Sequence, residues 1–76
     1  MVFPLSLARP GEIVSVESIA GGYGLQRKLS ELGLYPGEVI RVISSDRGPV
    51  VVEVKGSRVG IGYGMAKRIM VKRIRG

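Results

Sequence analysis

The feature of this sequence that most constrains its fold is a helix pattern that stops after about two turns. In the stretch LQRKLSELGLYPGEVIRV, Leu25, Leu29 and Leu32 recur at the spacing of one helix face. Gly33 follows at once, where a left-handed residue commonly closes a helix. We therefore predict a short helix over about residues 25–32. Because so short a helix is marginal alone, its leucines should pack against other elements.

The residues after this helix predict a stop and then a turn into a strand. Leu34 stands where a Schellman stop places a hydrophobic contact with Leu29. Pro36 cannot continue a helix and biases the residue before it toward an extended shape. With Gly37 it predicts a turn that leads into a strand over residues 38–45.

The rest of the chain alternates short apolar runs with glycine turns. Strands are predicted over residues 13–19, over the alternating valines of 50–54 and over 70–74, with a hairpin turn at 56–57. A second helical turn is predicted over about residues 64–69. Together these patterns predict a mainly-β fold, a small bent barrel of five to six short strands that forms one domain over residues 1–76.

Two short segments recur within the chain. PGEIVSV at residues 10–16 returns as PGEVIRV at 36–42, and GYGLQRKL at 22–29 returns as GYGMAKRI at 62–69. The two offsets differ, so the chain is not a regular repeat protein. An old duplication and similar turn chemistry arising twice both explain the recurrence.

The composition argues against catalysis. The chain has no histidine and no cysteine, the side chains that most often bind transition metals or activate a nucleophile near neutral pH. We therefore predict no catalytic, cofactor-binding or metal-binding residue, and no enzyme. No run approaches the roughly 18 apolar residues of a membrane span, and the N-terminus lacks the basic start of a signal peptide. The cytoplasm is the expected compartment.

Charge is distributed unevenly along the chain. Residues 1–53 carry a net charge of −1, whereas residues 54–76 carry seven basic residues and no acidic one. Arg27 and Lys28 in the first turn of the predicted helix oppose its dipole, which suggests that they serve binding. The alternative explanation is that all these charges only keep the protein soluble. The predicted partner-binding residues are Tyr23, Arg27, Lys28, Arg58, Lys67, Arg68 and Arg73.

The motifs taken together resemble the FeoA family. PLSLARPGE, GGYGLQRKLSELGLYPGEVIRV, GSRVGIG and MAKRIMVKRI follow in this order and cover about residues 4–74. The most specific part has the form LxxLGLxPG, with the structural residues Leu29, Leu32, Gly33, Leu34, Pro36 and Gly37. The resemblance implies an SH3-like barrel with an inserted helix, also similar to the C-terminal domain of iron-dependent repressors.

The resemblance also implies a role. FeoA proteins are small cytoplasmic accessory proteins of ferrous iron uptake, so the expected partner is the cytosolic part of the FeoB transporter at the inner face of the membrane. Family members often carry a transition-metal label, but this chain has no histidine or cysteine to support it. No winged helix precedes the domain, which argues against a DNA-binding regulator.

Two other kinds of partner are compatible with the sequence. A basic barrel could bind nucleic acid, but its stacking platform would depend on three tyrosines spread among loops. An open barrel edge would also allow pairing with a second copy of the chain.

Overall fold

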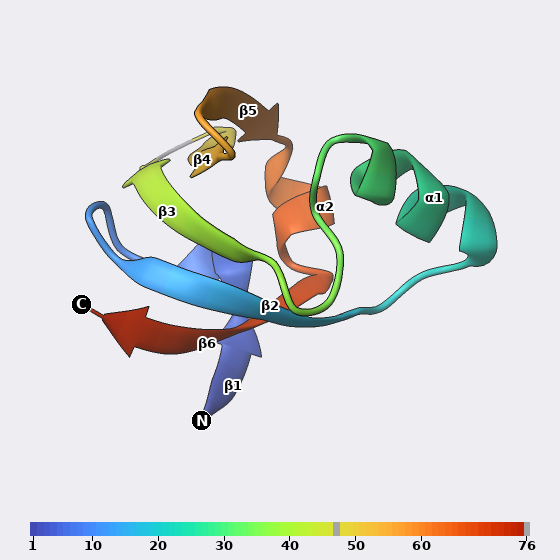
Figure 1. Cartoon of the computed structure of the whole chain (residues 1–76), viewed down its shortest axis with the longest axis horizontal. Coiled ribbons are helices and arrows are strands. Elements are labelled where there is room, and N and C mark those ends of the chain that lie inside the picture. The colour runs from blue at the N-terminus through green and yellow to red at the C-terminus, as the bar shows by residue number, and fades with distance from the viewer. Residues whose placement is uncertain (47, 76) are drawn as a thin grey trace.

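Six strands form one antiparallel sheet in a computed structural model of the chain, which describes residues 1–46 and 48–75 (Figure 1). In chain order the elements are β1 (Val2–Pro4), the 3-10 helix η1 (Leu5–Leu7), β2 (Ile13–Ile19), α1 (Tyr23–Glu31), β3 (Val39–Ser44), β4 (Val50–Val54), β5 (Ser57–Ile61), α2 (Tyr63–Ala66) and β6 (Ile69–Arg75). The order across the sheet is β1-β6-β2-β3-β4-β5. The predicted mainly-β fold is confirmed.

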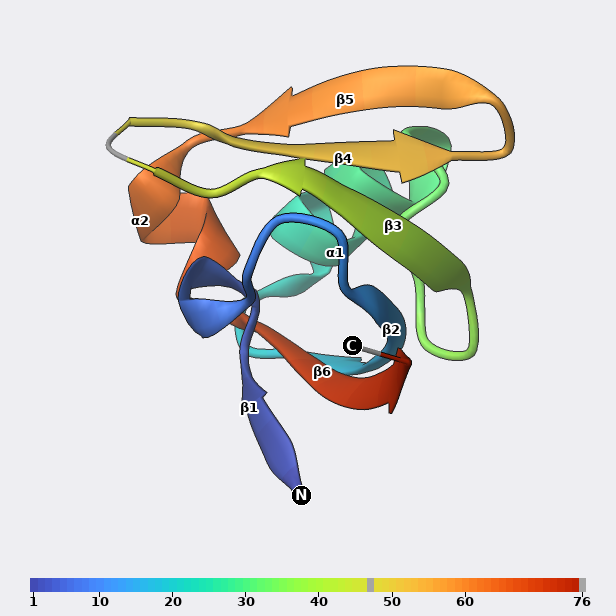
Figure 2. The same ribbon diagram turned by 90° about the vertical axis from the view of Figure 1, so that its left-hand side faces the viewer.

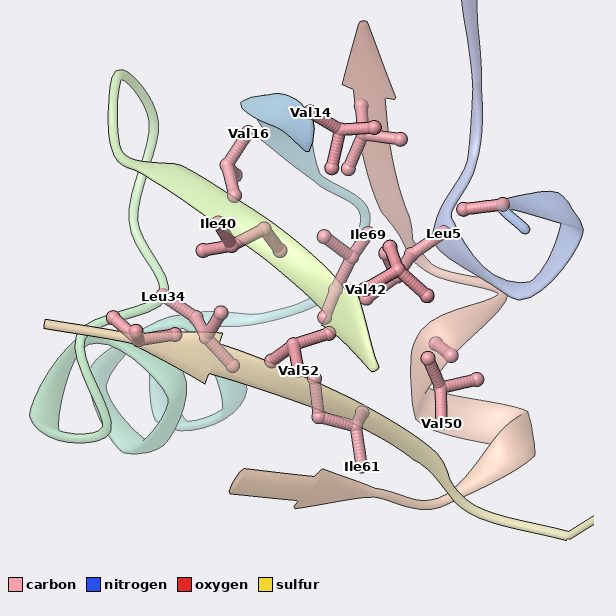
Figure 3. Close-up of a cluster of buried hydrophobic side chains, with 14 of the residues drawn as sticks. Leu5, Val14, Val16, Leu34, Ile40, Val42, Val50, Val52, Ile61 and Ile69 are labelled. Atoms are coloured by element: carbon pink, nitrogen blue, oxygen red, sulfur yellow. The ribbon is translucent and has the colours of Figure 1, made fainter. Parts of the chain in front are cut away.

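The sheet bends around an aliphatic core. Register shifts in the β2–β6 and β3–β4 ladders mark bulges, which bend strands and increase their twist. Alternate side chains of the strands then converge on the inside, as Figure 3 shows for Val14, Val42 and Val52, each at most 1% exposed. None of the helices that the structure describes is long and apolar enough to cross a bilayer.

The repeated PGE segments form two equivalent turns related by a local two-fold axis between β2 and β3. In each turn proline is followed by a glycine with positive φ, as in a type II turn. The Gly11 N–H donates to the Val42 carbonyl at 2.7 Å, and the Val42 N–H donates to the Glu12 carbonyl at 2.9 Å. The second turn repeats both bonds with Gly37, Val16 and Glu38, at 2.8 and 2.9 Å. Each turn is thereby fastened to the strand that follows the other turn.

The end of α1 has the predicted Schellman geometry. Gly33 adopts a φ of +89°, its N–H donates to Ser30, and the Leu34 N–H donates to the Leu29 carbonyl at 2.8 Å. Leu29 and Leu34 are both fully buried in the core. The prediction for Leu32 was wrong, because this side chain is 43% exposed. The helix ends at Glu31, so Leu32 no longer follows its periodicity.

Three boundaries differ from their predictions. Helix α1 begins at Tyr23 rather than Leu25, with Gly22 as its cap. The second helix spans Tyr63–Ala66 instead of 64–69, because Ile69 already pairs with Ile19 in the sheet. The hairpin turn lies one residue earlier than predicted, at residues 55–56, and both of these residues have positive φ, as a type I′ turn requires.

Candidate docking surface

The residues predicted to bind a partner do not form one patch. Tyr23, Arg27 and Lys28 lie on α1, Lys67 and Arg68 directly follow α2, Arg58 lies on β5, and Arg73 lies on β6. In Figure 1 the two helices lie to one side of the sheet, and the end of β6 lies away from them. A cation that is not held in an ion pair within the fold is available to bind a partner.

Arg73 is neutralised within the fold. Its guanidinium forms an ion pair with Glu12, which is only 7% exposed, and lies 4.7 Å from the Phe3 ring centroid. The Arg9 N–H also donates to the Glu12 carboxylate, at 2.7 Å. The hydrogen bond from Arg73, followed by that from Arg9, lowers the pKa of Glu12. Arg73 is therefore held by contacts within the barrel.

Three further cations are also paired. Arg41 contacts Glu53 at 3.0 Å, Lys55 contacts Glu38 at 3.4 Å, and Arg27 contacts Glu31 at 3.8 Å. Lys55 also donates a hydrogen bond of 2.8 Å to the hydroxyl of Tyr35. The pKa of Glu38 is lowered mainly by the hydrogen bond from the Val39 N–H and, to a smaller extent, by the one from Lys55. The pKa of Lys55 is raised mainly by its hydrogen bond to Tyr35 and, to a smaller extent, by the one to Glu38.

Of the predicted cations, Lys28, Arg58, Lys67 and Arg68 have no ion pair in the part of the chain that the structure describes, and all of these except Arg58 lie on or directly after a helix. Lys67 lies with its ammonium 5.7 Å from the centroid of the Tyr63 ring, in reach of a cation–π contact. Arg68 lines a hollow of about 240 Å³ between the two helices, with Leu25, Gly64 and Met65. Lys28 is exposed on α1 as the i+3 neighbour of Leu25, although it does not itself line the hollow.

Two tyrosines begin the two helices on this side. Tyr23 is 79% exposed and Tyr63 is 50% exposed, so both rings are open to contact by a partner. We call the surface made by Tyr23, Leu25, Lys28, Tyr63, Met65, Lys67 and Arg68 the helical face. Tyr63 and Met65 were missing from the predicted set, although the GYG repeat gave Tyr63 the same position as Tyr23.

A second and larger hollow lies beside α1. It measures about 440 Å³ and is lined by Ile19, Tyr23, Gln26, Arg27, Ser30, Glu31 and Pro36. Arg27 is the only cation among these lining residues, and it is paired with Glu31. Gln26 donates a hydrogen bond of 3.0 Å to the Gly21 carbonyl. This hollow therefore offers little net charge. No group of three or more carboxylates that could hold a metal occurs among residues 1–46 and 48–75.

Known proteins are similar to this chain in both sequence and fold. The FeoA domain family matches residues 3–73. A Methanocaldococcus jannaschii protein named Fe(2+) transport protein A is 39% identical over 71 residues, 93% of this chain and 87% of that protein. A crystal structure of the iron uptake regulatory protein FeoA aligns with a TM-score of 0.90 and 43% identity, covering 97% of this chain and 99% of the other.

Repressor structures share the fold alone. A manganese-dependent transcriptional repressor aligns with a TM-score of 0.88 but only 21% identity, and the match covers 96% of this chain and 41% of the repressor. The solution structure of FeoA from Chlorobium tepidum aligns with a TM-score of 0.86 at 26% identity, over 97% of this chain and 72% of that one. These matches confirm the SH3-like architecture, and the family match together with the relatives shows that the chain belongs to the FeoA domain family.

Proposed function

We propose that this protein is a non-enzymatic cytoplasmic accessory protein of ferrous iron uptake that docks through its helical face on the cytosolic part of a FeoB-type transporter. The names of its relatives, an Fe(2+) transport protein and an iron uptake regulatory protein, support the process. The absence of histidine and cysteine from the sequence supports a role without catalysis. Docking at the inner face of the membrane would be peripheral and through the partner.

The observation that carries the proposal is the combination of unpaired cations with exposed tyrosines on and directly after the two helices. Lys28, Lys67 and Arg68 have no ion pair among the described residues, and Tyr23 and Tyr63 begin the same two helices. Arg58, Lys72 and Arg75 also lack an ion pair there, but they lie on β5 and β6, which carry no tyrosine. Unpaired cations steer an acidic partner toward the surface, and exposed tyrosines supply contact area once it arrives. The helical face combines both properties around an apolar hollow.

Charge reversal tests the proposal. The double variant Lys28→Glu, Arg68→Glu changes the helical face, and both side chains are exposed, so folding should be retained. The matched control Lys72→Glu, Arg75→Glu makes the same change of net charge at two exposed positions of the strand β6. Binding to full-length FeoB in nanodiscs is measured by surface kinetics at low and high salt.

We expect the association rate of the helical-face variant to fall by roughly tenfold or more at low salt, while the control stays near wild type. Raised salt should slow the wild-type protein in the same way. Equal association rates of both variants and the wild type would show that the helical face is not the docking surface. Salt-dependent binding to random RNA, with none to FeoB, would favour the nucleic-acid alternative.

A further inference from the structure

The outer edge of the sheet at β5 is open. β5 is the last strand in the sheet order and pairs with β4 alone. Figure 2 shows it as the outermost strand of a hairpin that extends past the rest of the sheet. The opposite edge, β1, has three residues and includes Pro4, which has no N–H to offer. β5 has five residues and no proline, so it is the better edge for a further strand.

The hairpin turn determines which backbone groups face outward. The two-residue turn makes Val54 and Ser57 a hydrogen-bonded pair, and bonded pairs recur at every second residue of the ladder. The residues between them, Arg58 and Gly60, therefore turn their N–H and C=O groups away from β4. No other backbone bond is found for these two residues in the described part of the chain. An added strand would find two donors and two acceptors here.

The side chains on this edge alternate in character. Val59 faces the core side and is half-buried, whereas Arg58 lies on the outer side and is exposed. Glu53 is the cross-strand neighbour of Arg58, but its carboxylate contacts Arg41 instead, at 3.0 Å. Arg58 thus has no ion pair among the described residues.

Gly60 places no side chain on the outer side of β5. A Cβ at this position would meet no atom within 4 Å, and its φ lies outside the left-handed region, so the fold itself does not require glycine. Glycine in a strand costs stability and often marks the close approach of another backbone. Here it leaves the outer side of the strand open for a large side chain beside it.

We infer that β5 binds an extended segment of an acidic partner as a seventh strand, in which acidic and apolar residues alternate. An acidic side chain would lie opposite Arg58, and the apolar side chains on the other side would extend the surface around Val59. A second copy of this chain fits less well. Each copy carries a net charge of +6, and antiparallel pairing of two β5 edges would bring the two Arg58 side chains diagonally together. The inference does not depend on FeoB as the partner.

The probe is a peptide of about eight residues with blocked ends in which glutamate and valine alternate. Amide shifts of the isotopically labelled protein report where the peptide binds. One control peptide has the same composition in two blocks, and a second alternates lysine with valine. We expect the Glu–Val peptide to shift the amides of residues 57–61 and to bind more tightly than both controls.

Two variants test the contacts. Arg58→Glu should weaken binding of the Glu–Val peptide by roughly three- to tenfold and should reverse the preference toward the Lys–Val peptide. Gly60→Pro removes one outward N–H but no bond to β4, so it should abolish binding while the melting temperature stays close to wild type. If Gly60→Pro fails to fold, the reversed peptide preference of Arg58→Glu still tests whether the peptide binds along β5.

Several results would overturn the inference. They are no binding, shifts confined to the helical face, equal binding of the block peptide, and an unchanged preference in Arg58→Glu. Concentration-dependent shifts of β5 in the protein alone would show instead that a second copy occupies this edge.

Discussion

Replacing Gly33 by alanine should lower the free energy of unfolding by about 2–5 kcal/mol, from two separate terms. Gly33 has a φ of +89°, and placing an L-residue in the left-handed region costs about 1–2 kcal/mol. A Cβ would also lie 2.8 Å from Cγ1 of Val54. Val54 is buried and stiff at χ1, so relieving this contact requires a shift of the core, at about 1–3 kcal/mol.

Gly37→Ala separates the two terms. Gly37 also has a positive φ, +98°, but a Cβ there would meet no atom within 4 Å. It should therefore cost only the conformational term, about 1–2 kcal/mol. Chemical denaturation of both variants measures the difference. Val54→Ala removes the clashing methyl group, so the double variant with Gly33→Ala should be more stable than the sum of the single losses by about 1–3 kcal/mol.

Two results would refute this reasoning. If Gly33→Ala and Gly37→Ala lose the same stability, contact with Val54 adds nothing. If the losses of Gly33→Ala and Val54→Ala are simply additive, the strain lies elsewhere.

Changes at Leu29, at Glu12 and in the metal content of the solution test three other features of the protein. Leu29→Ala should cost about 2–5 kcal/mol by chemical denaturation, whereas Leu32→Ala should cost less than about 1 kcal/mol because its side chain is half exposed; equal losses would contradict the burial pattern. The folded-state pKa of Glu12 is lowered, so its contribution to stability is present above its unfolded pKa and is lost as the pH falls through the folded pKa. Thermal melts should show this acid loss in the wild type and a shallower one in Glu12→Gln; parallel curves would contradict the role of Glu12. Ferrous iron or zinc should bind no more tightly than the high-micromolar range and barely change the melting temperature, and a stoichiometric sub-micromolar site in calorimetry would contradict this.

The parts of the fold that depend on neighbouring residues could be predicted from the sequence. The stop of α1 follows from Gly33 and Leu34 within one turn of the helix, and its hydrogen bonds are as predicted. The hairpin turn could not be placed correctly, because it requires positive φ at Lys55, which is rare for a lysine. Its side chain is fastened to Tyr35, 20 residues earlier in the chain. Local patterns do not contain that contact.

The candidate site was predictable only in part, for the same reason. Which cations are available depends on ion pairs between distant residues, such as Arg73 and Glu12, 61 positions apart. The N-terminal segment shows the same limit. Leu5 is fully buried, and a Ser45 hydroxyl bond of 2.6 Å to the Ala8 carbonyl helps to hold the segment in place. Neither contact has a periodic signal in the sequence.

The paired PGE turns have a consequence for the motion of α1. The bonds between Val16 and the turn at residues 37–38 close the base of the loop that carries the helix, and the matching bonds of Val42 hold the other end of the same strand pair. With its base closed, the ends of this loop stay together when the largely exposed first turn of α1 frays, so the turn re-forms without a long-range search. Amide exchange should therefore be faster in the first turn of α1 than at Val16 and Val42. Because Leu29 and Leu34 of this loop are fully buried, the C-terminal end of α1 moves only together with the core.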